Sequence, residues 1–186
     1  MEGSTISSLI TLTEGGDRSA GDALFAALYA ELHELARRQL AGGGGTLGPT
    51  TLLHDAYLKM SQQERAVFPD RPRFMGYAAK VMRHLVVDHA RQRGAQKRGG
   101  AFHITTLDED SAAAIADDAE IVRVGAALEE LTAVDPELAD IVDLKFFCGF
   151  SFPEIAQMRG ISERTVQRRW EKARMYLRHK IRADAT

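Results

Sequence analysis

Residues 152–171 restrict the possible fold more than any other segment of the chain. They read FPEIAQMRGISERTVQRRWE. The small Ala156 stands where two helices must approach closely, Gly160 follows four residues later where a turn is needed, and Val166 follows six residues beyond as a core contact of a second helix. This spacing predicts a helix-turn-helix, in which two short helices are joined by a tight turn.

The starts of both helices are marked by capping residues. Ser151 and Glu154, three residues apart, predict a capping box, because each side chain can bind a free backbone N–H of the other residue. Phe150 and Ile155 flank this box at the spacing of a hydrophobic staple. Ser162 is the expected N-cap of the second helix, since a serine hydroxyl accepts hydrogen bonds from the first turn.

The second helix of this motif carries a basic face. Because the N-terminal half of a recognition helix enters the DNA major groove, we expect its exposed side chains to contact base edges and phosphates. These side chains are Glu163, Arg164, Thr165, Gln167, Arg168, Arg169 and Lys172. The alternative is a solvated basic helix beside a protein core, which is the common meaning of a charge run. Trp170 is expected to pack against that core rather than to stack on DNA.

Charge is segregated along the chain, although the net charge is only −2. Residues 71–98 hold eight Lys or Arg and one acid, residues 107–120 hold six acids and no base, and residues 159–182 hold nine basic and two acidic residues. Clustered positive charge favours binding to nucleic acid. The order basic, acidic, basic therefore indicates two blocks suited to nucleic acid with an acidic stretch between them.

Apolar residues recur at helical spacing along the chain, and no β alternation of useful length occurs. Helices are predicted over residues 24–40, 50–62, 73–92 and 120–131. A further helix opens at Pro136 after the N-cap Asp135. The third helix is expected to end at Arg93-Gly94, and the glycine run 42–45 is a connector. The fold class is therefore all-α.

The predicted helices fall into two small domains. Residues 20–98 form the first, residues 120–183 form the second with its helix-turn-helix, and residues 1–19 are an N-terminal tail. Residues 99–119 mix glycine, alanine, threonine and acids without a sustained period, which predicts a flexible acidic linker. A chain of 186 residues can bury two cores of this size.

Residues 74–93 place aromatic and basic side chains on one predicted helix. This combination suits single-stranded nucleic acid, because nucleobases stack on aromatic rings while positive charge neutralises the phosphates. Strand capture and duplex recognition would then occupy separate domains. Phe74 and Tyr77 have an alternative interpretation as core residues, which their helical spacing favours.

Three segments in the right order resemble extracytoplasmic-function sigma factors, a group of bacterial RNA polymerase sigma factors in the sigma-70 family. Residues 50–60 (TTLLHDAYLKM) are similar to the family's acidic-Asp-Leu-Val-Gln-Glu-x-Phe-Leu-Arg-Leu stretch, and residues 77–88 (YAAKVMRHLVVD) to its Trp-Leu-Tyr-Arg-Ile-Ala-Arg-Asn-x-x-x-Asp pattern. Residues 149–156 (GFSFPEIA) resemble the Gly-x-Ser-x-x-Glu-Ile-Ala start of its helix-turn-helix. The Pro49-Thr50 start also resembles a subgroup whose members often accompany Ser/Thr kinases.

The resemblance implies a two-domain sigma factor, monomeric when free, that binds the clamp helices and flap of core RNA polymerase and directs it to promoter DNA. The first domain (region 2) would hold the clamp through Thr50, Thr51, His54 and Asp55. It would capture the melted −10 element through Phe74, Tyr77, Lys80, Arg83, His84 and Arg91. In this set, His84 either helps to choose the flipped base or is an ordinary exposed polar residue. The second domain (region 4) would read the −35 element as duplex.

The chain departs from the family at Thr50 and Thr51, where typical relatives carry acids that help to hold the clamp. Only Asp55 remains, so we expect weaker association with the polymerase. Our hypothesis is that a Ser/Thr kinase phosphorylates Thr50 or Thr51 and supplies the missing charge beside a helix N-terminus. Thr50, which follows Pro49, is the better candidate. The alternative is that Thr50 is simply an N-cap. Control by a kinase would make a membrane anti-sigma factor less necessary.

The residues alone leave two rival functions open. A stand-alone helix-turn-helix regulator would dimerise on a palindromic site, but it would leave the first basic block unexplained. An enzyme would need more than the pairs His54 with Asp55 or His84 with Asp88, because no third ligand or nucleophile has matching spacing. We therefore expect no enzymatic activity, no metal and no cofactor.

The single cysteine, Cys148, lies in the apolar run KFFCGF and is expected to pack as a small apolar side chain, which suits a reducing cytoplasm. The sequence has no signal-peptide pattern and no window of about 18 uncharged apolar residues. We therefore expect a cytoplasmic protein without membrane contact.

Overall fold

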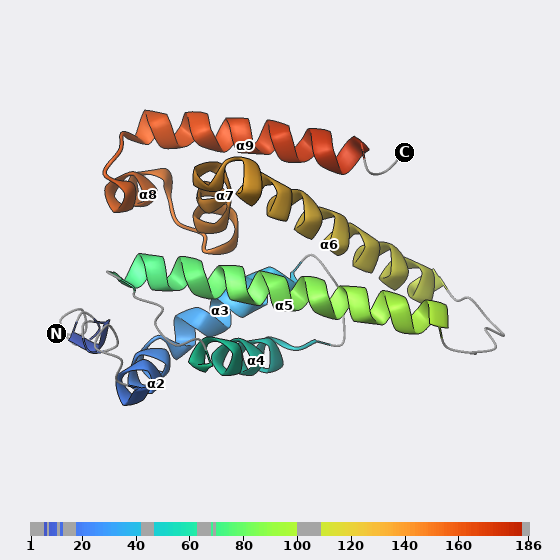
Figure 1. Cartoon of the computed structure of the whole chain (residues 1–186), viewed down its shortest axis with the longest axis horizontal. Helices are drawn as coiled ribbons and strands as arrows, with labels where there is room; N and C mark the ends of the chain where they lie inside the picture. Colours follow the sequence, from blue (N-terminus) through green and yellow to red (C-terminus); the bar gives the residue numbers. More distant parts are fainter. Residues whose placement is uncertain are drawn as a thin grey trace.

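The computed structural model is predominantly helical over the residues that it describes (Figure 1). Those residues are 6, 8–10, 12, 18–41, 47–62, 68, 70–99 and 109–183. No strand occurs among them, which confirms the all-α prediction. None of the helices in this part of the chain is long and apolar enough to cross a membrane.

The first group of helices, which we call the N-terminal half, consists of α2 (Arg18–Ala27), α3 (Tyr29–Leu40), α4 (Pro49–Ser61) and α5 (Arg71–Gly99). The prediction of one helix over residues 24–40 is wrong, because α2 and α3 meet at Leu28, whose φ of −101° and ψ of 9° are not helical. Leu24, Leu28 and Leu32 are all buried. The break therefore lets two helices present these leucines to one core.

Helix α5 is longer than its sequence pattern predicts. The expected end at Arg93-Gly94 is wrong, because α5 continues through this pair to Gly99. A glycine inside a helix costs about 1 kcal/mol relative to alanine. Here the neighbouring Arg93 is fixed by an ion pair with Asp118 of the next helix. Tertiary contact therefore outweighs the local signal to stop.

The second group, which we call the C-terminal half, consists of α6 (Glu109–Val134), α7 (Pro136–Val142), the π-helix η1 (Asp143–Phe147), α8 (Phe152–Arg159) and α9 (Glu163–Ala183). Helix α6 begins at Glu109, within the predicted linker 99–119, whose limits stay a prediction. Residues 100–108 of that predicted linker lie outside the described part. The segment SAAAIADDA is rich in alanine, the strongest helix former, and its acids obscured that signal.

The start of α7 follows its sequence signals. The Asp135 side chain accepts a hydrogen bond from the Leu138 N–H at 3.2 Å, and Pro136 takes the first helical position, which confirms the predicted cap. α7 then continues without a break into η1, and the N–H of its C-cap residue Cys148 donates to the Asp143 carbonyl at 2.9 Å. This wider turn ends beside the helix-turn-helix.

One hydrophobic core joins the two halves. In Figure 1, α5 runs between α2, α3 and α4 on one side and the C-terminal half on the other. Leu53 and Met82 of the N-terminal half are buried in the same cluster as Leu128 and Leu131 of α6. Ile10, within the predicted N-terminal tail, is buried there too. The predicted domain limits stay predictions, but α5 is a central helix covered from both sides.

Candidate nucleic-acid interface

The helix-turn-helix is built from the capping residues that its sequence predicts. Ser151 and Glu154 form the capping box that opens α8, and the hydrogen bonds from Ser151 lower the pKa of the Glu154 carboxyl. Gly160 ends α8 in the left-handed region with φ of 62°, which glycine adopts without a Cβ clash. The Ser162 hydroxyl accepts from the Thr165 N–H at 3.2 Å and caps α9. The predicted motif is therefore confirmed as a geometry.

A small apolar cluster lies beneath the turn. Ile155 and Val166 are fully buried in it, and Ala156 allows the close approach of α8 and α9. Phe150 is packed against the same cluster, as its predicted staple contact with Ile155 requires. Trp170 is packed against this cluster and against the main core, which confirms that it is a packing residue.

Helix α9 directs a row of polar side chains to solvent. Among the predicted DNA contacts, Glu163, Arg164, Gln167, Arg168 and Lys172 are exposed, while Thr165 and Arg169 are partly buried. Arg169 forms an ion pair with Glu137 of α7 at 2.6 Å. Lys172 pairs with Asp135 at 3.5 Å. Arg164 and Arg168 therefore stand out as exposed cations in the N-terminal half of α9.

The predicted −10 residues all lie on α5, but most of them face protein rather than solvent. Tyr77, Lys80 and His84 are partly buried, and Arg91 is exposed. Phe74 is only 4% exposed and meets the Phe68 ring edge-on at 5.3 Å, so it is the core residue of the alternative interpretation. Arg83 is also 4% exposed. In this conformation neither Phe74 nor Arg83 can contact nucleic acid.

Arg83 is held by a buried acid of the C-terminal half. Its Nη1 forms an ion pair with Asp143 at the start of η1, and its guanidinium lies 5.5 Å from the centre of the Phe147 ring. Burial raises the pKa of Asp143 to about 6, although the nearby Arg83 and Lys80 act to lower it. Asp143 was not among the residues predicted from the sequence. The available signal was a single acid inside the apolar run IVDLKFF.

His84 lies near this ion pair. Its pKa is lowered, first by burial and then by the positive charge of Arg83, against an opposing effect of Glu129 on α6. The neutral form is therefore favoured at pH 7. His84 is half-buried at the contact between the halves. It therefore matches neither of the two sequence interpretations fully, since it is neither an ordinary exposed residue nor openly available to contact a base.

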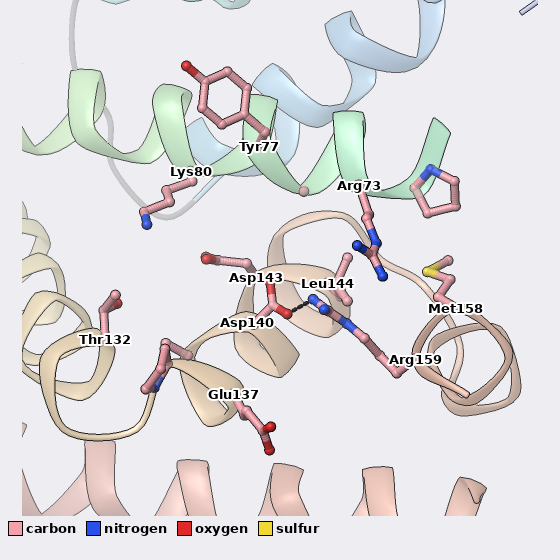
Figure 2. Close-up of a pocket in the computed structure, with 14 residues that line it drawn as sticks. Arg73, Tyr77, Lys80, Thr132, Glu137, Asp140, Asp143, Leu144, Met158 and Arg159 are labelled. Carbon is pink, nitrogen blue, oxygen red and sulfur yellow. Dashed lines mark ion pairs between the residues drawn. The ribbon is translucent and has the colours of Figure 1, made fainter. Parts of the chain in front are cut away.

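A cavity of about 460 Å³ lies between α5 and the C-terminal half (Figure 2). Arg73 and Lys80 reach toward it from α5, while Asp140 and Asp143 reach toward it from α7 and η1. Arg159 of α8 also lines it and pairs with Asp140. Positive and negative side chains are mixed in its wall, so the cavity has no single charge preference.

The predicted clamp-binding residues lie on the first two turns of α4. Thr50, Thr51 and His54 are exposed, and Asp55 is partly buried. Thr50 and His54 also border an apolar cavity of about 350 Å³ whose wall includes Tyr57. The structure therefore brings the four predicted residues together on one short helical surface.

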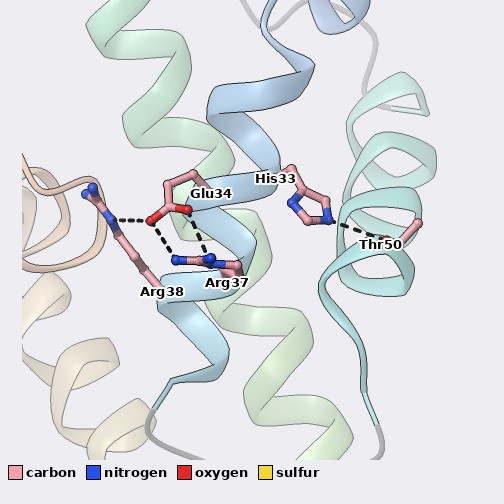
Figure 3. Close-up of polar contacts among 5 residues, drawn as sticks. All are labelled: His33, Glu34, Arg37, Arg38 and Thr50. Atoms are coloured by element: carbon pink, nitrogen blue, oxygen red, sulfur yellow. Dashed lines mark hydrogen bonds and ion pairs between the residues drawn. The ribbon is translucent and has the colours of Figure 1, made fainter.

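Thr50 is not the N-cap of α4. Gly48 takes that position, Pro49 follows at the first helical position, and no side chain caps the helix start. The Thr50 hydroxyl instead lies 3.4 Å from Nε2 of His33 on α3 (Figure 3). The N-cap alternative is therefore wrong, and the Thr50 side chain is exposed at an uncapped helix N-terminus.

The described residues contain no group of three or more His, Cys, Asp or Glu side chains that could hold a metal ion. The pairs that the enzyme hypothesis relied on, His54 with Asp55 and His84 with Asp88, therefore have no third ligand in that part of the chain. Cys148 is partly buried, and burial raises the pKa of its thiol to about 12. It packs as the sequence predicts.

The fold and the exposed basic α9 define a helical protein of the helix-turn-helix class, which is built to bind DNA. The family model for the ECF sigma factor matches residues 3–183, nearly the whole chain, so the protein belongs to the ECF sigma factor family. It is accordingly a transcription initiation factor that binds core RNA polymerase and promoter DNA, rather than an enzyme. No curated protein matches the chain.

Proposed function

We propose that this sigma factor divides promoter recognition between its two basic helices, with α9 on the −35 duplex and α5 on the melted −10 strand, and that α4 holds the polymerase clamp. The observation that carries the proposal is the exposed N-terminal face of α9. Arg164 and Arg168 lie there behind the Ser162 cap and next to a buried Val166 that fixes the helix orientation. Arginines so placed can form bidentate hydrogen bonds with guanine.

The proposal for α5 rests on the side chains that the melted strand would need. Tyr77, Lys80 and Arg91 offer one aromatic ring and two cations along one helix, which suits stacking and phosphate contact. Arg83 and His84 join this set only when α5 is uncovered, because both are buried or half-buried against the C-terminal half. Binding the −10 strand therefore requires the two halves to separate.

We further propose that phosphorylation of Thr50 strengthens binding to the clamp. The first turn of α4 contains no acid, and its N-terminal N–H groups have no side-chain cap. A phosphate there would add a charge of about −1.5 to −2 at the positive end of the helix dipole. The His33 imidazole, 3.4 Å from the Thr50 hydroxyl, would donate to it when protonated. Thr51 is exposed as well and is the second candidate.

The partner that this proposal requires is a cytoplasmic Ser/Thr kinase. Transcription by bacterial polymerase takes place in the cytoplasm, so we propose the same location for this chain. Thr50 is exposed and so is accessible to a kinase. The neighbouring apolar cavity, lined by Phe25 and Tyr29, offers a seat for a helix of the polymerase clamp.

The test is run-off transcription with purified bacterial core polymerase and the promoter upstream of the chain's own gene. We compare unmodified protein, kinase-treated protein and the variants Thr50→Glu, Thr50→Ala and Thr51→Glu. Initiation that rises with Thr50→Glu and kinase treatment, but not with Thr50→Ala, is expected. Equal initiation by all proteins would reject control at Thr50 but would still support the function of the chain as a sigma factor. Thr51→Glu shows whether an acid at any position of the first turn suffices.

A stand-alone regulator would give a different result in the same experiment. It would fail to initiate with core polymerase in every form, and it would protect a palindromic site without polymerase.

A further inference from the structure

The apolar cavity beside α4 has aromatic rings from three helices in its wall. Phe25 lies on α2, Tyr29 on α3 and Tyr57 on α4. The rings of Phe25 and Tyr57 meet edge-on with their centres 4.9 Å apart, and Tyr29 is 47% exposed. The face of an aromatic ring is electronegative and attracts cations. We call this cavity the aromatic pocket, and its wall suits a positively charged group.

An acid lies in the same wall. Asp22 of α2 accepts a hydrogen bond from the Tyr57 hydroxyl at 2.8 Å, and this bond is the main cause of the raised pKa of Tyr57. Asp22 is exposed, and it forms no ion pair with another described residue. The exposed His54 imidazole also lines the pocket and offers an acceptor nitrogen when neutral. Among the described residues, no Lys or Arg lines the pocket, so Asp22 has no permanent cation beside it.

The chemistry of this wall favours a cation over an apolar occupant. An apolar side chain would take water away from the Asp22 carboxylate without replacing it, which is unfavourable. A guanidinium group would contact the carboxylate and the rings together, because it is planar, stacks on aromatic faces and donates several N–H hydrogen bonds. Arginine is therefore the side chain that this pocket fits best.

The aromatic pocket adjoins the surface that is proposed to hold the clamp. Thr50 and His54 belong to both. The first turn of α4 contains no acid, so that turn itself offers a cationic partner no negative charge. A partner that lies over Thr50 and His54 is within reach of the pocket, since both residues are in its wall.

We propose that the aromatic pocket is the receptor for one arginine side chain of the polymerase clamp: Asp22 supplies the counter-charge, and Phe25, Tyr29 and Tyr57 contact the guanidinium group. The inference deepens the proposed function and rests on it, because it takes the clamp as the partner of α4. Asp22 thereby supplies from α2 a charge that the first turn of α4 lacks. A phosphate on Thr50 would add negative charge to the wall of the same pocket.

The first test measures the affinity of the full chain for purified bacterial core polymerase by isothermal titration calorimetry. Asp22→Asn removes the charge and keeps an oxygen that can accept from Tyr57. Tyr29→Leu removes an exposed ring and keeps an apolar side chain. Each change is made in the unmodified chain and in Thr50→Glu, so that a requirement for charge at Thr50 does not hide the contribution of the pocket.

Two further variants are the matched controls. Glu31→Gln removes an acid of α3 that lies outside the pocket and already pairs with Arg71. Tyr29→Phe keeps the ring that Tyr29→Leu removes. We expect Asp22→Asn to weaken binding by about tenfold and Tyr29→Leu by about fivefold. Glu31→Gln should bind as the wild type does, and Tyr29→Phe should recover most of the affinity that Tyr29→Leu loses.

Wild-type affinity in Asp22→Asn would overturn the proposal, because no counter-charge would then be in use. Wild-type affinity in Tyr29→Leu would overturn it as well, because the rings would then bind no cation. Failure of every protein to bind, wild type and Thr50→Glu included, would instead contradict the proposed role of α4. In that case the second test, which uses no polymerase, decides whether the pocket binds arginine.

The second test titrates the full chain with N-acetyl-arginine amide and follows the ring resonances of Tyr29 and Tyr57 by NMR. N-acetyl-norleucine amide, which has a similar side chain without charge, is the matched ligand. We expect shifts that saturate with the arginine derivative, that are smaller in Asp22→Asn at the same concentration and that the norleucine derivative does not produce. Equal shifts with both derivatives, or none with the arginine derivative, would overturn the proposal.

Discussion

Helices α5 and α9 have similar sequences in one respect and opposite positions in the structure. Both are long and basic, and both follow a pattern that predicts contact with nucleic acid. α9 lies on the outside with Arg164 and Arg168 exposed, whereas α5 lies at the centre with Arg83 buried. A run of positive charge therefore identifies a helix that needs anions. Whether those anions belong to DNA or to the same chain is decided by the tertiary structure.

The largest expected effect is the difference in stability between replacing a buried arginine and replacing an exposed one. Arg83→Ala leaves Asp143 buried without a partner, so we expect the free energy of unfolding to fall by about 3 kcal/mol. Arg168→Ala should change it little, because Arg168 is exposed. Urea denaturation followed by circular dichroism measures both. Similar losses for the two variants would break the distinction between the helices.

The second effect is a dependence of folding stability on pH. The contact of α5 with Asp143 should produce it, and the contacts of α9 should not. The pKa of Asp143 is about 6 in the folded protein and 3.8 when unperturbed. The folded state therefore binds this proton more tightly than the unfolded state does. The stability that the bound proton contributes is complete below about pH 4 and is lost as pH rises through about 6. We expect the free energy of unfolding to fall by about 3 kcal/mol over this range, and Asp143→Asn to remove this dependence on pH. Denaturation at several pH values checks this, and an unchanged slope in Asp143→Asn contradicts it.

The third effect concerns α9 and duplex DNA. Arg164→Ala should weaken binding of the −35 duplex by about 1–3 kcal/mol if this side chain contacts a base edge. Binding should also fall steeply with salt, because cations that neutralise phosphates release counterions. Fluorescence anisotropy with the −35 duplex measures both effects. Arg174→Ala, further along α9 and paired with Glu171 at 3.1 Å, is the control.

The smallest expected effect tests the local signals that fix α9. Ser151→Ala removes the capping box of α8 and should lower the free energy of unfolding by about 1 kcal/mol. Thr51→Ala, at an exposed position of α4, provides a control for the loss of a hydroxyl group. Thermal denaturation measures the change, and a loss no larger than that of the control would show that the box contributes nothing to the orientation of the motif.

The sequence predicted the helix-turn-helix because its signals are local. The capping box, the left-handed Gly160 and the buried Val166 all lie within a few residues of the turn that they build. The covering of α5 could not be predicted in the same way. Asp143 is 60 residues from Arg83 in the chain, and no local pattern joins them. The length of α6 was missed because acidic residues in an alanine-rich helix resemble a solvated linker.

Cys148 is a natural chemical probe of the contact between the two halves. Its thiol lies at the contact between the halves, 3.6 Å from the Met75 carbonyl oxygen of α5, and burial raises its pKa to about 12. A thiol in that state is nearly inert toward alkylating reagents, because the thiolate is the reacting species. Separation of the halves would return it to ordinary reactivity. The rate of alkylation of this natural residue therefore reports how often the two halves separate, with no label or mutation needed.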